Sequence, residues 1–92
     1  MANIFTQIQR KVNQGKFAFL DHARDELADE NFSAIEAIGV ILKPFNYFVY
    51  DNDPSHKRYA FEGFVNNDRM LRVICFVSNA KVYIKTAYEI FD

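Results

Sequence analysis

The second half of the chain is a series of strand-like segments, and this series most constrains the fold. Apolar, aromatic and β-branched residues concentrate in four runs: Tyr47–Tyr50, Arg58–Val65, Arg69–Val77 and Lys81–Glu89. The last three runs are separated by polar loops short enough for hairpins, Asn66–Asp68 and Ser78–Ala80. We therefore expect these three strands to be antiparallel neighbours in one sheet.

The first half of the chain has the periodicity of helices. Apolar residues between Ile4 and Val12 recur at helical spacing, and Gly15 is a natural end for that helix. Asp21 is a favourable N-cap for a second helix, whose apolar stripe begins at Ala23. Two amphipathic helices are therefore expected at the start of the chain.

A capping box marks the start of a third helix. Ser33 and Glu36 have the S-x-x-E spacing, in which each side chain satisfies the backbone N–H of the other residue, and Pro44 ends the helix. We expect Lys16–Leu20 to be a short extended entry to the second helix. Together these patterns predict a single α+β domain over residues 1–92. Its N-terminal helices should pack on one face of a four-stranded antiparallel β-meander.

Composition allows one hydrophobic core and excludes a strongly basic protein. Half of the 92 residues are hydrophobic, and ten Phe and five Tyr supply large side chains for burial. The 11 basic and 12 acidic residues give a net charge of −1, so no overall field attracts a polyanion. We therefore do not expect a nonspecific nucleic-acid coat protein, whereas a local basic patch is compatible with this charge balance.

Cys75 is the only cysteine, which excludes an intramolecular disulfide and a Cys-rich zinc site. It lies inside an apolar strand-like run, so we expect a small buried hydrophobic residue, the alternative being a reactive thiol. No stretch approaches the roughly 20 apolar residues of a membrane span. The start of the chain also lacks the pattern of a secretory signal, and we expect a cytoplasmic protein.

Alternation along the last three strands assigns their side chains to two sheet faces. The apolar set should face the helices, and it comprises Tyr59, Phe61, Val65, Leu71, Val73, Cys75, Val77, Val82, Ile84, Thr86 and Tyr88. The opposite set should form a more open face, and it comprises Arg58, Ala60, Glu62, Arg72, Ile74, Phe76, Tyr83, Lys85 and Glu89. A register change of one residue would move a side chain to the other face.

Basic and aromatic residues on the expected open face suit RNA cleavage. Attack of a 2′-hydroxyl on the neighbouring phosphate needs cations around the phosphate and a group that moves the proton, without a metal or cofactor. Arg72 and Lys85 are expected to hold the phosphate, with Arg58 in support. Tyr83 is a candidate to stack a base or to move the proton. The alternative is an ordinary solvated face with ion pairs such as Arg58–Glu62. Separately, we expect Arg72 to be exposed and to contribute little to stability.

His22 is the other candidate for moving a proton. It lies in the first turn of the predicted second helix, and histidine changes its charge near neutral pH. The alternative is that His22 anchors the helix start by hydrogen bonding. His56 lies in the most polar loop, and we expect it to be exposed. The second helix carries four acidic residues at helical spacing, which indicate a solvated face and no metal site: Asp25, Glu26, Asp29 and Glu30.

Aromatic residues in the first strand-like run indicate a second kind of function. Phe45, Tyr47, Phe48 and Tyr50 are more rings than one short edge strand can bury. Some of these rings are therefore expected to contact a partner or a second copy of the chain. The alternative to an RNA-cleaving enzyme is a non-catalytic interaction module, a homodimer formed through the aromatic strand edge.

The chain resembles a small uncharacterised bacterial domain family. The resemblance rests on Phe17-x-Phe19-x-Asp21-His22-Ala23 with Leu27 and Ser33, on Gly63 and Leu71-Arg72-Val73-Ile74, and on Ile84-Lys85-Thr86-Ala87-Tyr88. That family is in turn similar in layout to the RelE, ParE and BrnT toxins of toxin–antitoxin pairs. The resemblance implies an RNA-cleaving toxin held inactive by an antitoxin protein, or an inactive relative of such a toxin.

Overall fold

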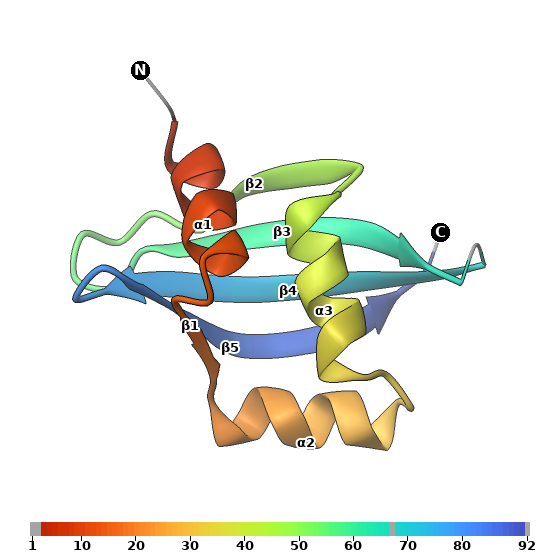
Figure 1. The fold of residues 1–92 in the computed structure, drawn as a ribbon. Helices are drawn as coiled ribbons and strands as arrows, with labels where there is room; N and C mark the ends of the chain where they lie inside the picture. Colours follow the sequence, from red (N-terminus) through yellow and green to blue (C-terminus); the bar gives the residue numbers. More distant parts are fainter. Residues whose placement is uncertain (1–2, 67, 92) are drawn as a thin grey trace.

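The computed structural model describes residues 3–66 and 68–91. Its helices and strands follow in the order α1 (Ile4–Asn13), β1 (Phe17–Phe19), α2 (Asp21–Asp29), α3 (Ala34–Leu42), β2 (Asn46–Asp51), β3 (Arg58–Val65), β4 (Arg69–Ser78) and β5 (Lys81–Ile90). The strands form one sheet in the order β1-β5-β4-β3-β2 (Figure 1). The predicted α+β class is confirmed. Within the described residues, no helix has the length and apolar character needed to span a membrane.

The sheet has five strands and is mixed, so the prediction of four antiparallel strands was wrong. The segment expected only as an extended entry is β1, which pairs in parallel with β5. Val82 N donates to Lys16 O at 3.0 Å, and Leu20 N donates to Ile84 O at 2.9 Å. A three-residue strand is too short to show a strand period in the sequence, and only the neighbouring edge of β5 defines it.

Helices α1 and α3 cover one face of the sheet, whereas α2 lies along its β5 edge (Figure 1). The predicted capping box opens α3: Ser33 N donates to Glu36 Oε1 at 2.8 Å and Glu36 N donates to Ser33 Oγ at 3.1 Å. The N-cap of α2 is Leu20, and Asp21 is the first helical residue, so the predicted Asp21 cap was wrong. The bond from Leu20 N to Ile84 O holds Leu20 extended, and α2 begins directly after it.

The core lies between the helices and one sheet face. Cys75 is fully buried there, as expected, and burial raises the pKa of its thiol to about 12. Gly63 lets α3 approach the sheet closely, since a Cβ at this position would lie 3.2 Å from Val40 Cγ1. The predicted hairpin between β3 and β4 is confirmed by their antiparallel pairing, although Asn67 itself lies outside the described residues.

A β-bulge in β5 changes which side chains reach which face. Ile74 pairs with Thr86 and the next residue of β4, Cys75, pairs with Ile84, so Lys85 is an extra residue in β5. Beyond the bulge the alternation is reversed, and Ala87 is in the core. The prediction was therefore wrong for three side chains: Thr86 and Tyr88 lie on the open face, and Glu89 lies on the helix side.

Two carboxylates of α2 continue the hydrogen bonding of β5 where β1 ends. Glu26 Oε1 accepts from Ala87 N at 3.1 Å and also from the Thr86 hydroxyl, and Glu30 Oε2 accepts from Glu89 N at 3.2 Å. The acidic side of α2 was predicted to be a solvated face, and for these two residues that was wrong. An edge strand leaves backbone N–H groups unpaired, and these carboxylates satisfy them.

Arg69 connects α2, β4 and β5. Its Nε and Nη2 donate to both Glu89 oxygens at 3.0 and 2.7 Å, and Nη2 also donates to Glu30 O at 2.9 Å. Its guanidinium lies 4.0 Å from the centre of the Phe32 ring. This clamp fixes the C-terminal end of α2 against the sheet.

We predict that Glu89→Gln lowers the free energy of unfolding at neutral pH. The hydrogen bond from Arg69 lowers the pKa of Glu89 below its ordinary value of 4.5. The stabilisation is therefore present above that value and is lost as the pH falls through the lower folded-state pKa. Denaturant unfolding of wild type and variant should give a difference at pH 7 that shrinks below about pH 4.5. An equal difference at every pH would contradict this, and Asp29→Asn serves as an exposed α2 control.

Candidate active site

The open face of the sheet is built from rows of side chains that cross the strands. One row is Glu62, Arg72 and Tyr88, which are paired across β3, β4 and β5. The next row is Ala60, Ile74 and Thr86, paired in the same way. Ala60 and Ile74 are almost fully buried, although none of the helices in the described residues covers this face, because taller side chains surround them. The second row is therefore a low floor between higher walls.

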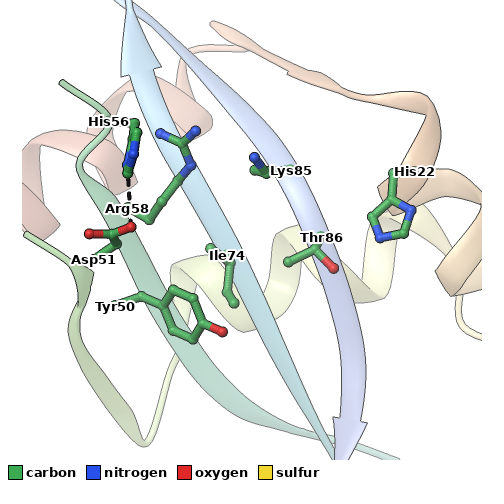
Figure 2. Close-up of a pocket in the computed structure, with 8 residues that line it drawn as sticks. All are labelled: His22, Tyr50, Asp51, His56, Arg58, Ile74, Lys85 and Thr86. Carbon is green, nitrogen blue, oxygen red and sulfur yellow. Dashed lines mark ion pairs between the residues drawn. The ribbon is translucent and has the colours of Figure 1, made fainter. Parts of the chain in front are cut away.

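A hollow of about 340 Å³ lies over this floor, and we call it the trough. Its lining residues are His22, Tyr50, Asp51, His56, Arg58, Ile74, Lys85 and Thr86 (Figure 2). The residues come from α2, β2, the β2–β3 loop and the three long strands. The volume lies at the lower end of the range that small-ligand pockets occupy.

Two β-bulges supply residues of the trough. Lys85 is the extra residue of β5, and Tyr50 lies at the register shift of β2, where Val49 pairs with Tyr59 and Asp51 pairs with Arg58. A bulge breaks the alternation of a strand and re-aims a side chain. Both interruptions of the sheet therefore place a functional group at the same hollow.

His22 borders the trough at its α2 end. Its side chain is 70% exposed, and its Nε2 lies 3.4 Å from Glu26 Oε1. Glu26 is held by the Thr86 hydroxyl and by Ala87 N, so the carboxylate next to the imidazole has a fixed position. Among the described residues, Nδ1 of His22 has no hydrogen-bond partner, which leaves it available to a ligand.

His56 borders the opposite end of the trough and pairs with two carboxylates. Its Nδ1 lies 3.2 Å from Asp51 Oδ2, and its Nε2 lies 3.5 Å from Asp53 Oδ2. Hydrogen bonds from the backbone and side chain of Ser55 lower the pKa of Asp53. Strands are spaced about 4.8 Å apart, and at least two such spacings separate the β2–β3 loop from α2. His22 and His56 therefore face different parts of any bound molecule (Figure 2).

Arg58 and Lys85 are the two cations among the lining residues of the trough, and Figure 2 shows their side chains on the same face of the sheet as the floor residue Ile74. The Arg58 guanidinium lies 4.6 Å from the centre of the Phe76 ring. Phe76 in turn stacks on Tyr83, with ring centres 5.3 Å apart. This stack fixes one wall of the trough, and Tyr83 belongs to that wall without lining the trough itself.

Arg72 and Glu62 form a closed network beside the trough. Arg72 Nε donates to Glu62 Oε2 at 2.7 Å and Nη1 donates to Tyr88 Oη at 2.9 Å, while Asn46 Nδ2 donates to Glu62 Oε1 at 3.0 Å. Glu62 is only 6% exposed. The expected Arg58–Glu62 pair is therefore replaced by Arg72–Glu62, and the prediction of an exposed Arg72 was wrong, since its side chain is 27% exposed.

The structure thus brings together three of the six predicted site residues at the trough: His22, Arg58 and Lys85. Glu62, Arg72 and Tyr83 lie on the same sheet face but in the walls. Sequence reasoning missed Tyr50, Asp51 and Thr86, because bulges have no sequence signature. It predicted an exposed loop position for His56, which is confirmed, but did not link His56 to the site. The Asp51-x-Asp53-x-x-His56 spacing was the one available signal.

The polar lining of the trough consists of two cations, two imidazoles, a phenol, a hydroxyl and the Asp51 carboxylate, which faces His56. In the part of the chain that the structure describes, no three His, Cys, Asp or Glu side chains are arranged to hold a metal ion. Two cations over an uncharged floor suit an anion such as a phosphate. An imidazole with a free nitrogen at the same hollow suits proton transfer.

A family model described as a domain of unknown function (DUF4258) matches residues 19–89. This match confirms the predicted resemblance to an uncharacterised domain family, and it includes every residue of the trough. The further likeness to RelE-, ParE- and BrnT-type toxins is not confirmed. No curated protein and no solved structure matches the chain significantly.

Proposed function

The chain belongs to the DUF4258 family, a domain of unknown function, so the family itself does not give an activity. From the residues that line the trough, we propose metal-independent cleavage of RNA through the 2′-hydroxyl. The observation that carries the proposal is the convergence of both sheet bulges on this hollow. Bulges disrupt the hydrogen-bonded ladder and are frequent next to active sites, where they re-aim a side chain. Here the β5 bulge turns Thr86 to the trough next to Lys85, its extra residue, and both line the trough together with His22 and Arg58.

The proposed reaction is an internal transfer at one phosphate. Nδ1 of His22 takes the proton of the 2′-hydroxyl, the 2′-oxygen bonds to phosphorus, and the bond from phosphorus to the 5′-oxygen breaks. The departing 5′-oxygen takes a proton from the Lys85 ammonium, and solvent returns the proton held by His22 to Lys85. The products are a 2′,3′-cyclic phosphate and a 5′-hydroxyl, with no water consumed.

The other residues hold the strand and the site. Arg58 binds the phosphate that neighbours the reacting one, since its planar guanidinium matches two phosphate oxygens. Glu26 positions His22 by facing Nε2, which leaves Nδ1 as the nitrogen that takes the proton. Arg72 is assigned to the framework, because each of its three guanidinium nitrogens already contacts Glu62 or Tyr88.

A toxin role follows if the cleaved RNA is essential to the host, and an antitoxin protein is then the expected partner. The test is induced expression in a bacterial host, with growth and total RNA integrity followed together. Growth arrest with fragmented RNA supports the proposal. Normal growth with intact RNA contradicts the toxin role, provided that an immunoblot shows soluble protein in the cells.

A second candidate function rests on the edge strand β2. It ends the sheet order, and its large side chains are about half exposed: Tyr47, Val49 and Tyr50, with Phe45 just before the strand. Exposed apolar edges pair readily with other strands. On this ground we also propose a homodimer in which two β2 strands pair.

We predict that Val49→Lys abolishes such a dimer, because a lysine on an edge strand opposes strand pairing. Light scattering after size exclusion should give a mass that rises with concentration for the wild type and stays monomeric for the variant. Ile35→Lys, at an exposed position of α3, is the matched control and should leave the dimer intact. A wild-type mass that stays monomeric at every concentration would contradict the homodimer.

A further inference from the structure

Tyr50 is an aromatic residue of the trough with an uncovered ring. It is 51% exposed and lies at the β2 bulge. The other rings of the open face pack against neighbours: Phe76 on Tyr83, and Phe48 and Tyr88 beside Arg72. Among the described residues, Tyr50 makes no ring–ring or cation–ring contact.

The surroundings of Tyr50 match the parts of one nucleotide. In Figure 2 the Tyr50 side chain is directed toward Ile74, and the cations Arg58 and Lys85 border the same floor. A nucleotide presents a flat base and an anionic phosphate, which need a flat ring and cations at the same hollow. Base–aromatic stacking depends little on sequence, because every base has a π-face.

We propose that Tyr50 stacks on an unpaired base, so that the substrate is single-stranded RNA whose phosphates lie along Lys85 and Arg58. This inference rests on the proposed function and names its substrate class. A base inside a duplex is already stacked on both faces and cannot lie on Tyr50, which excludes the paired form. A second hollow of about 440 Å³ shares His56 and Arg58 with the trough. It would let a bound RNA strand continue from the trough past the β2–β3 loop.

The test is binding of a fluorescently labelled oligoribonucleotide that carries 2′-fluoro groups, since it lacks the attacking hydroxyl and is not cleaved. We expect Tyr50→Ala to weaken binding of the single strand about 10-fold or more, and Tyr50→Phe to bind as the wild type does. Annealing the complementary strand should weaken binding to the wild type. Phe91→Ala removes an exposed ring outside the trough and is the matched control.

The outcomes separate this inference from the proposed function. Equal binding by wild type and Tyr50→Ala, or tighter binding of the duplex, would overturn the stacking role while leaving cleavage of RNA intact. If the wild type binds neither form, and also leaves unmodified RNA uncleaved, both proposals fail. Circular dichroism of each variant checks that it is folded before binding is compared.

Discussion

Replacing Lys85 with Met is expected to lower the rate of RNA cleavage about 100-fold to 1,000-fold, the range found when one group that stabilises a transition state is removed. Methionine keeps an unbranched side chain that is one atom shorter than lysine, and it removes the charge and the proton. Lys85 is exposed, so the variant should unfold close to the wild-type temperature. The measurement is the initial rate on a single-stranded RNA, together with a thermal melt.

Lys43→Met is the matched control for this prediction. Lys43 is also an exposed lysine, and it is the C-cap of α3 on the helix side of the sheet. Its replacement should change neither the rate nor the melt. A Lys85→Met enzyme that cleaves RNA at the wild-type rate would remove Lys85 from the reaction and with it the functional argument from the β5 bulge.

Replacing Arg72 with Ala is expected to destabilise the fold by about 3 kcal/mol, the lower end of the cost of breaking a buried ion pair. The substitution leaves the buried Glu62 carboxylate with Asn46 as its remaining partner. Total stability for a domain of this size is only about 5–15 kcal/mol, so the loss should lower Tm by about 10 °C or more. Denaturant unfolding and a thermal melt measure it.

The double variant Glu62→Leu with Arg72→Met separates a framework role from a catalytic one. It removes both charges and fills the space with apolar side chains, which for buried pairs is often neutral or stabilising. We expect Tm to return close to the wild-type value and RNA cleavage to persist. A stable double variant without cleavage would place Arg72 among the phosphate-binding residues instead of the framework.

The elements of this fold could be predicted where their signal is local. The capping box at Ser33 and Glu36 and the period of α1 both depend on residues within one or two turns of helix. β1 could not be predicted, since three residues form a strand only because β5 offers a free edge. The sequence contains the donor and acceptor groups of that pairing but no sign of the pairing itself.

The candidate site could be predicted in part for the same reason. Strict alternation placed Lys85 and Arg58 on the open face, and the structure agrees. Alternation fails after the bulge, and so Thr86 and Tyr88 were assigned to the wrong face. A bulge depends on how two strands fit together, and a single residue inserted there reverses every later side chain of the strand.

The sequence also does not show which residues form ion pairs with one another on the open face. Arg58 and Glu62 both lie on β3, four residues apart, and at roughly 13 Å along the strand they are too far apart for an ion pair. The partner of Glu62 therefore comes from β4, and only the register between β3 and β4 decides which residue it is. The register places Glu62 opposite Arg72, and this pairing leaves Arg58 to stack on Phe76 beside the trough. One cation thereby becomes part of the framework and the other stays available to a ligand.

The measurement that tests the central claim most directly is cleavage of one defined single-stranded RNA by the purified protein in the presence of EDTA, with the products identified by mass spectrometry. A second substrate carries a single 2′-deoxy nucleotide at the cleaved position. Cleavage through the 2′-hydroxyl should give a 2′,3′-cyclic phosphate and a 5′-hydroxyl from the first substrate, and no cleavage at the deoxy position of the second. Cleavage that ignores the missing hydroxyl, or intact RNA in both reactions, would contradict the proposed reaction.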